Sequence, residues 1–206
     1  MHWSTCYDAL AGKLQPTLLL PDHPTEDRKP AAVALILQPN GTGLELLLIE
    51  RAHHPADPWS GNIGLPGGRR DPADASLRHT AERETREEVG IDLADARFFG
   101  RLSDVVGANL PVRVACFVYG LTTPVEMLLS DEVHDAFWYG LEALRMPERQ
   151  VLAPVRFGER QLEAPAIDLG LPGKPVLWGI TYRLVSQFRE LLESGEQRQL
   201  PYELPL

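Results

Sequence analysis

The sequence predicts an α/β protein of the α+β kind, an α/β/α sandwich in which a mixed sheet lies between helices. Short apolar runs typical of buried strands lie on both sides of residues 72–89, a charged segment with the length and end signals of a helix. A second segment, residues 176–193, has the spacing of an amphipathic helix. Strands that flank one helix and precede another favour a sheet covered on both faces.

Length and composition favour one globular domain behind an N-terminal arm. The chain has 206 residues, of which 44% are hydrophobic, enough to bury a core without disulfides or a structural metal. Residues 21–30 are polar and proline-rich, which is typical of a linker. We therefore expect an arm and linker over residues 1–29 and the domain over residues 30–206. The pattern leaves open whether the arm covers the sheet or a partner subunit.

The first elements of the expected domain form a hairpin. Residues 31–38 are a continuous apolar run, residues 39–43 have turn composition, and residues 44–51 are again apolar until their last two positions. A loop follows over residues 52–60, and residues 61–66 predict a short strand that ends at a glycine pair.

The central helix has recognisable end signals. Asp71 is a candidate N-cap, Pro72 suits the first helical position, and Asp74 would lie near the positive end of the helix dipole. Gly90 is the expected C-terminal stop. We therefore predict a helix over residues 72–89.

Later segments complete the sheet and cover it. Three further strands are expected, over residues 98–106, 112–121 and 135–141. A peripheral hairpin is expected over residues 148–157 and 160–167. The C-terminal helix would turn a set of apolar side chains toward the sheet: Leu177, Ile180, Leu184, Phe188, Leu191 and Leu192.

Charge and end signals exclude several classes of function. The formal net charge is −9 and no long run of Lys or Arg offsets it, so binding to nucleic acid by phosphate neutralisation is not expected. No apolar run approaches the ~20 residues that span a bilayer, and the N-terminus lacks signal-peptide features. Cys6 and Cys116 have no ligand-like spacing and read as free thiols. The sequence therefore predicts a cytoplasmic protein, with a homodimer as one assembly that it allows.

Three carboxylates on the central helix indicate a metal site. Glu84, Glu87 and Glu88 are spaced i, i+3 and i+4, which puts them on one face. Like charges placed together are destabilising unless a cation compensates them, and Mg²⁺ or Mn²⁺ prefers carboxylate oxygens and water. Arg83 lies four residues before Glu87 and is suited to hold a carboxylate in place. The alternative is a solvated charged face of a structural helix.

The glycine pair ahead of the helix, Gly67-Gly68, allows backbone to pass close to a ligand or to the helix. By itself the pair reads as a strand-to-helix turn. Its fixed distance from three glutamates that end at a glycine favours a functional site.

Together these residues resemble the signature of the Nudix hydrolase family. That signature runs Gly, five residues, Glu, seven residues, then Arg-Glu-apolar-x-Glu-Glu-x-Gly-apolar. Its second half matches Arg83, Glu84, Glu87, Glu88, Gly90 and Ile91. Thr85 replaces an apolar residue, Asp74 replaces the first Glu, and eight residues separate Asp74 from Arg83.

The longer spacing and the Asp71-Pro72-x-Asp74 step resemble the coenzyme A diphosphatase branch of the family. The resemblance continues outside the signature, at residues 31–33, 47–51 and 176–181. One stretch departs from the branch, which usually carries His-x-Gly-Gln before its glycines, whereas this chain has Trp59-Ser60-Gly61-Asn62.

The resemblance implies metal-dependent hydrolysis of a diphosphate that joins a nucleoside to a second group, with coenzyme A or a derivative as the leading small-molecule substrate. It implies that Glu84, Glu87 and Glu88 are metal ligands, and that Glu84 or Glu88 alternatively accepts a proton from the attacking water. Arg83 would orient a carboxylate. The family often recruits a later carboxylate, for which Glu132 is the candidate, although a loop residue before a strand is the more usual interpretation.

Other polar and aromatic residues have two interpretations each. Arg51 is a candidate phosphate ligand or a surface ion-pair partner. Trp59 and Trp178 are candidates to stack on a base or to pack in the core. His79 and His134 read as exposed polar positions.

Two other functions remain as alternatives. The first is a Nudix diphosphatase that acts on ADP-ribose, NADH or another nucleoside diphosphate derivative. The second, of a different class, is a non-catalytic nucleotide-binding regulator with the same fold, which would be free to lose Glu84, Glu87 or Glu88. All three glutamates are present.

Overall fold

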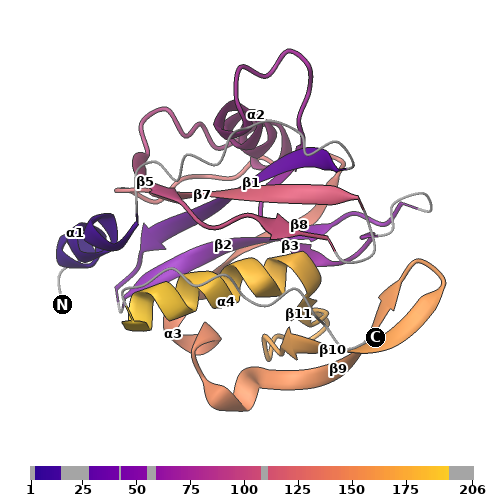
Figure 1. Cartoon of the computed structure of the whole chain (residues 1–206). Helices are drawn as coiled ribbons and strands as arrows, with labels where there is room; N and C mark the ends of the chain where they lie inside the picture. Colours follow the sequence, from indigo (N-terminus) through magenta and orange to yellow (C-terminus); the bar gives the residue numbers. More distant parts are fainter. Residues whose placement is uncertain (1–2, 15–27, 42, 55–58, 108–110, 195–206) are drawn as a thin grey trace.

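The fold places a mixed sheet between two helices (Figure 1). The computed structural model describes residues 3–14, 28–41, 43–54, 59–107 and 111–194. Its main sheet contains β1 (Lys29–Pro39), β2 (Leu44–Arg51), β3 (Ile63–Gly64), β4 (Gly67–Arg69), β5 (Arg97–Arg101), β6 (Val105–Val106), β7 (Val112–Gly120) and β8 (Val133–Gly140). A smaller sheet contains β9 (Gln150–Phe157), β10 (Arg160–Ile167) and β11 (Leu177–Trp178). The helices are α1 (Trp3–Lys13), α2 (Leu77–Val89), α3 (Leu141–Leu144) and α4 (Gly179–Ser194), with a 3₁₀ turn at Pro147–Arg149.

Strand β1 is the centre of the main sheet and makes it mixed. It runs parallel to β7 from Lys29 to Leu37 and antiparallel to β2 and β4. Strand β8 pairs with the other edge of β2, and β5 with the other edge of β7. The mixed sheet expected from the sequence is therefore confirmed.

Alternate side chains of β1 serve two cores, one on each face of the sheet. Ala34 and Ile36 belong to the cluster that includes Ala81 of α2. Leu35, between them, belongs to the cluster that includes Phe188 of α4. Because successive side chains of a strand point to opposite faces, an all-apolar strand is what a sheet buried between two helices requires. Figure 1 shows α2 above the sheet and α4 below it.

The strand predictions agree with the structure. The expected hairpin is β1–β2, with Leu44–Arg51 as predicted. The expected strand over residues 98–106 is divided into β5 and β6. The peripheral hairpin is β9–β10, and it belongs to the separate smaller sheet. Cys116 is a buried core residue of β7, as expected.

The start of the central helix was predicted wrongly. Helix α2 begins at Leu77, and its N-cap is Ser76, whose side chain accepts a hydrogen bond from the His79 N–H at 3.1 Å. Asp71 instead accepts from the Ala73 N–H in the turn before the helix. The predicted end is right, because Gly90 adopts the left-handed conformation with φ 72° and its N–H donates to the Arg86 carbonyl.

Helix α4 also begins later than predicted. Residues Leu177–Trp178 form β11 and pair with Ile167 and Ala166 of β10, and the helix starts after them at Gly179, where φ is +68°. A two-residue strand depends on a distant partner, which sequence periodicity does not report. The apolar face of the helix is as expected, with Leu184, Phe188 and Leu191 buried.

The N-terminal arm contains helix α1, which packs on the domain core. Tyr7 and Leu10 are buried in the same cluster as Phe188. The hydroxyl of Tyr7 lies 3.0 Å from the Leu37 carbonyl and 2.9 Å from the Leu121 carbonyl, at the ends of β1 and β7. Residues 21–27 of the expected linker lie outside the described residues. Among the described helices none is long and apolar enough to cross a membrane.

Candidate active site

The glycine pair forms part of the sheet, which corrects the prediction of a turn. Gly67 and Gly68 belong to β4 and pair with Val33 and Ala32 of β1. Gly67 has φ +150°, and a Cβ added there would lie 2.3 Å from the Ala32 carbonyl oxygen. Glycine is therefore required at position 67 by the close approach of two backbones.

Gly68 is required for a different reason, which is the nearness of Glu84. A Cβ added at Gly68 would meet the Glu84 carboxylate at 2.5–2.7 Å. The missing side chain thus leaves room for a carboxylate from α2 to lie directly against β4.

Glu88 is the buried carboxylate of the helix. It is 2% exposed, and its Oε2 accepts a hydrogen bond from the Gly67 N–H at 2.8 Å. Its Oε1 lies 3.7 Å from Nη1 of Arg51. The pKa of Glu88 is raised to about 7, chiefly by burial; the charges of Glu84 and Glu132 also raise it, whereas the Gly67 N–H and Arg51 lower it.

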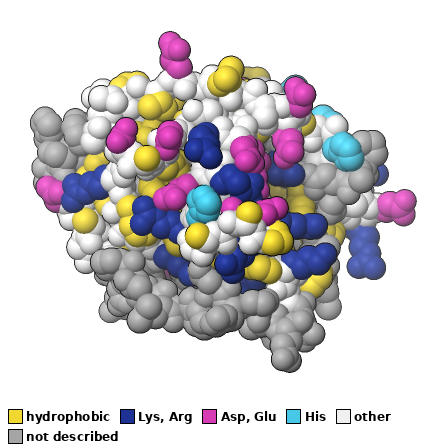
Figure 2. All heavy atoms as spheres, turned by 90° about the horizontal axis from the view of Figure 1, so that it is seen from above, with side chains coloured by type: hydrophobic (Ala, Val, Ile, Leu, Met, Phe, Trp, Pro, Cys, Tyr) yellow, Lys and Arg dark blue, Asp and Glu magenta, His cyan; other side chains and the backbone are white. Residues whose placement is uncertain are grey.

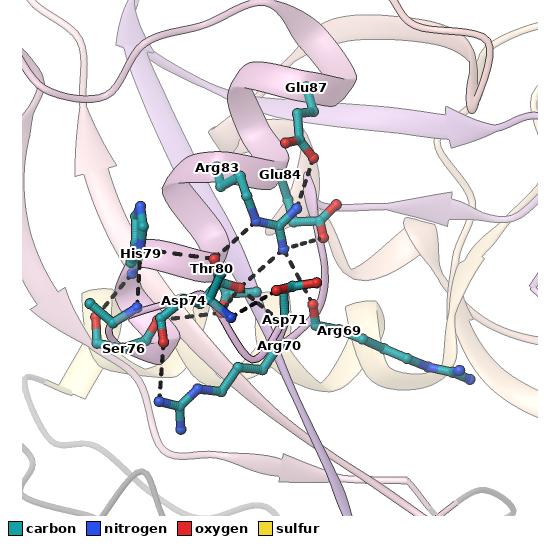
Figure 3. Close-up of polar contacts among 12 residues, drawn as sticks. Arg69, Arg70, Asp71, Asp74, Ser76, His79, Thr80, Arg83, Glu84 and Glu87 are labelled. Carbon is teal, nitrogen blue, oxygen red and sulfur yellow. Dashed lines mark hydrogen bonds and ion pairs between the residues drawn. The ribbon is translucent and has the colours of Figure 1, made fainter.

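Arg83 holds the two other carboxylates of the face (Figure 3). Its Nη2 lies 2.8 Å from Oε1 of Glu84, and its Nη1 donates to Oε2 of Glu87 at 2.8 Å. Glu87 is exposed, whereas Glu84 is largely buried, and burial raises the pKa of Glu84. The prediction that Arg83 orients carboxylates agrees with this geometry.

Asp74 fixes Arg83 from the opposite side, a role that the sequence reading did not assign to it. Its carboxylate accepts from Nε and Nη2 of Arg83 at 3.0 and 3.1 Å, from the Thr80 hydroxyl, and from the Asp71 N–H. The hydrogen bond from Arg83 is the largest cause that holds the pKa of Asp74 well below its usual range. Asp74 is therefore a buried acceptor ahead of the helix and does not lie in its first turn.

Glu132 and Arg51 reach the site from other elements. The Glu132 carbonyl accepts from the Ala52 N–H at 2.9 Å, which ties its loop to the end of β2, where Arg51 lies. The negative charge of Glu132 raises the pKa of both Glu84 and Glu88. The loop carboxylate is thus close enough to belong to the same electrostatic site.

One pocket of about 590 Å³ connects these side chains. It is lined by all eight residues that the sequence predicted for the site: Arg51, Gly67, Gly68, Arg83, Glu84, Glu87, Glu88 and Glu132. Its size is that of a small-molecule site. On the face seen in Figure 2, acidic and basic side chains lie next to one another, so this face is not uniformly negative despite the net charge of −9.

Two lining residues, Asn62 and Phe157, were not among the predicted site residues. Trp59 and Trp178, for which the sequence left both base stacking and core packing open, also line the pocket. Phe157 is at the end of β9, far from the other site residues in sequence, and no motif marks it. His79 and His134 are exposed, as expected.

The carboxylates suit a metal ion by their chemistry but not by their present arrangement. Among the described residues, no group of three or more His, Cys, Asp or Glu side chains is arranged closely enough to hold one. The reason is local, because Arg83 engages Glu84 and Glu87 while Glu88 turns to the Gly67 N–H. The chemistry still fits a hard cation, since burial and neighbouring carboxylates raise the pKa of both Glu84 and Glu88, and added positive charge would stabilise their charged forms.

Comparison with known proteins identifies the fold and signature. The family model of the NUDIX domain matches residues 27–160. The NUDIX domain of Shewanella oneidensis NrtR, solved in complex with ADP ribose, has a TM-score of 0.54 at 22% identity and covers 80% of this chain and 88% of its own. At that identity the likeness concerns the fold alone.

Two curated relatives extend the comparison. The mitochondrial coenzyme A diphosphatase NUDT8 of Homo sapiens is 30% identical over 138 residues, which are 66% of this chain and 57% of that protein. An uncharacterized protein of Schizosaccharomyces pombe is 43% identical over 113 residues, which are 51% of this chain and 34% of that protein. The chain therefore spans between a third and three fifths of the length of these relatives.

Proposed function

Because the chain belongs to the Nudix family, we propose that it hydrolyses the diphosphate of a nucleoside diphosphate derivative, with coenzyme A or a derivative as its substrate. The products from coenzyme A would be 3′,5′-ADP and 4′-phosphopantetheine. The proposal concerns the activity of the whole protein, whereas the structure describes residues 3–14, 28–41, 43–54, 59–107 and 111–194.

The observation that carries the proposal is the meeting of Glu84, Glu88 and Glu132 in one pocket beside Gly68. Glu84 and Glu132 each raise the pKa of Glu88, and Glu132 also raises that of Glu84. A structural helix gains nothing from this arrangement, because mutual repulsion and burial of carboxylates both disfavour their charged forms. Perturbed carboxylates in a pocket are instead typical of catalytic sites.

Glu84, Glu87 and Glu88 are the residues that would hold Mg²⁺ or Mn²⁺. When bound there, the ion would screen the diphosphate charge and lower the pKa of a water molecule. Charge balance favours this set. Within the described residues, Arg83 is the only residue whose ion pairs include both Glu84 and Glu87, so one positive charge faces two negative charges.

The protein's own groups would position the reaction. Arg83, braced by Asp74, holds Glu84 and Glu87 in fixed directions. Arg51 lies beside Glu88 at the pocket wall, where its guanidinium is suited to bind a phosphate oxygen. Glu88, with a pKa of about 7, or Glu84 is suited to accept a proton near neutral pH.

The choice of coenzyme A rests on the sequence. The Asp71-Pro72-x-Asp74 step and the longer spacing to Arg83 resemble the coenzyme A diphosphatase branch, and the human relative is named for that activity. Within this step, Asp74 accepts a hydrogen bond from Arg83 and so anchors its guanidinium.

Glu88→Gln and Glu84→Gln test the carboxylate assignment. Each removes a charge with almost no change in volume, so we expect loss of Mg²⁺- or Mn²⁺-dependent turnover with a retained fold. Glu82→Gln is the matched control, because Glu82 is on the same helix but pairs with Arg78 and Tyr119 outside the pocket. Undiminished turnover in both site variants would contradict the proposed role.

A substrate panel tests the chemistry of the leaving group. Coenzyme A, ADP-ribose, NADH and simple nucleoside diphosphates are compared at equal concentration with each metal. Cleavage of another compound but not of coenzyme A would overturn the branch assignment and keep the diphosphatase. Binding without cleavage of any compound would favour a nucleotide-binding regulator.

A further inference from the structure

Three aromatic side chains line the same pocket as the carboxylates. They are Trp59, in the turn before β3, Phe157, at the end of β9, and Trp178, in β11. The centroid of the Phe157 ring lies 6.4 Å from that of Trp59 and 6.5 Å from that of Trp178, with interplanar angles of 65° and 85°. The three rings therefore form one continuous aromatic wall.

The wall and the carboxylates come from different parts of the fold. The glutamates project from α2, above the sheet in Figure 1, while β9 and β11 belong to the smaller sheet below it. A molecule that contacts both the carboxylates and the aromatic wall would be bound at two chemically different places, one charged and one aromatic.

Asn62 holds the wall together and adds a polar group. Its Oδ1 accepts a hydrogen bond from Nε1 of Trp178 at 3.0 Å, and its backbone N–H donates to the Trp59 carbonyl at 3.0 Å. Since the amide oxygen is an acceptor here, the amide nitrogen is left as a donor. Asn62 also lines the pocket, and no hydrogen bond of this nitrogen is found within the described part of the chain.

Core packing alone does not account for these rings. Trp59, Phe157 and Trp178 are each only partly buried, in contrast to the fully buried Phe188 below the sheet. Large aromatic surface left open to a pocket, with a hydrogen-bond donor beside it, is typical of a site for a planar polar ligand.

We propose that Trp59, Phe157 and Trp178 form the subsite that stacks on the heteroaromatic base of the nucleotide. Asn62 is its polar residue, and its amide donates to an acceptor on the edge of the base. Stacking accepts any base because each has a π-face, and the donor would pair with a ring-nitrogen or carbonyl acceptor, which every base presents. This inference rests on the proposed function, because it names where that substrate's base would lie.

The test uses adenosine, which carries the base but no phosphate. The binding of adenosine and of ribose to the full chain is measured by saturation-transfer NMR in EDTA, where neither metal binding nor turnover contributes. We expect saturation of the adenine protons and none of free ribose. Trp178→Leu should weaken adenosine binding about tenfold, the size of one base–aromatic contact, while Trp178→Phe, which keeps a ring, should restore most of it.

Two further variants separate the subsite from general effects. Asn62→Asp keeps an acceptor for the Trp178 indole but removes the amide donor, so adenosine binding should weaken. Trp138→Leu is the matched control, because Trp138 is a partly buried tryptophan that packs in the cluster on the α2 face and does not line the pocket; it should leave binding unchanged.

Equal binding of adenosine and ribose, or unchanged adenosine binding in Trp178→Leu, would overturn the inference. These results are independent of hydrolysis. If the protein cleaves its substrate while Trp178→Leu leaves KM unchanged, the base subsite fails and the proposed function stands. If no compound is cleaved while adenosine still binds through Trp178, the subsite stands and the proposed function fails.

Discussion

The guanidinium of Arg83 is bound by Asp74 through two hydrogen bonds, from Nε at 3.0 Å and from Nη2 at 3.1 Å. The contact joins the turn ahead of α2 to the helix face that carries the glutamates (Figure 3). Because the Asp74 side chain is 2% exposed, it is both an anchor for the helix start and the support of the site's positioning residue.

Asp74→Asn should destabilise the protein and make the loss depend on pH. The variant replaces a charged acceptor of Arg83 with a neutral amide, which we expect to cost about 2–3 kcal/mol of unfolding free energy at neutral pH. The hydrogen bond from Arg83 lowers the pKa of Asp74 in the folded protein, so its contribution is present above the unfolded pKa of about 4 and is lost as the pH falls through the folded value.

Urea denaturation of both proteins between pH 7 and pH 3 measures this effect. The difference in unfolding free energy should be largest at pH 7 and should shrink below about pH 4. Asp71→Asn is the control, since Asp71 is exposed and its carboxylate accepts from the Ala73 N–H. A difference that stays constant across this range would contradict the role given to Asp74.

Ser76→Ala tests where the central helix begins. The Ser76 side chain caps α2 through the His79 N–H, and loss of such a cap costs about 1 kcal/mol. Asp71→Ala, at the position that the sequence favoured as the cap, should cost less. Thermal and urea unfolding of the two variants distinguish Ser76 from Asp71 as the N-cap. A larger loss of stability in Asp71→Ala than in Ser76→Ala would favour Asp71 as the start of the helix.

Local signals predicted those parts of the fold that local physics determines. The apolar runs of β1 and β2 and the stop at Gly90 follow from burial and from glycine's left-handed conformation. The start of α2 does not follow from local signals. Asp71-Pro72 satisfies the local rules for an N-cap, but Asp74 is held in the interior by hydrogen bonds from Arg83 and Thr80.

The residues of the candidate site also divide into those that local spacing predicts and those that depend on tertiary packing. The spacing of Glu84 and Glu88 was readable because one helix face sets it. The place of Phe157 was not, since it depends on how the β9–β10 hairpin lies against Trp59 and Trp178. Glu132 was found by resemblance to the family and could not have been found from spacing.

Tyr7→Phe should loosen the N-terminal helix. The buried hydroxyl lies within hydrogen-bond distance of the Leu37 and Leu121 carbonyls, and burial raises its pKa. Its removal leaves the phenyl ring in contact with Phe99, so we expect a loss of about 1 kcal/mol. Asp8→Asn, which breaks an exposed ion pair with Arg97, should change the urea midpoint little. Similar midpoints for Tyr7→Phe and the wild type would show that the hydroxyl does not hold α1.

Gly67→Ala should lower the stability of the fold and Gly68→Ala should lower turnover, although the two residues are adjacent. At Gly67 the new Cβ would meet the Ala32 carbonyl and the Val33 backbone, which have no room to move in a paired sheet. We expect a loss of about 2–3 kcal/mol in stability, since such overpacking strains the backbone. At Gly68 the three atoms nearest to the Cβ would all belong to the Glu84 carboxylate, the far end of a flexible side chain.

Gly68→Ala should therefore keep the fold and impair the proposed reaction. Displacement of a reacting or ligating group by about 1 Å is able to lower the rate about 100-fold, so kcat should fall strongly while the unfolding midpoint stays close to that of the wild type. Turnover with each metal and urea unfolding are measured on both variants, with Gly140→Ala as a reference because Gly140 does not line the pocket and nothing lies within 4 Å of a Cβ added there. Full activity in Gly68→Ala would mean that the position of Glu84 against β4 is not required for catalysis.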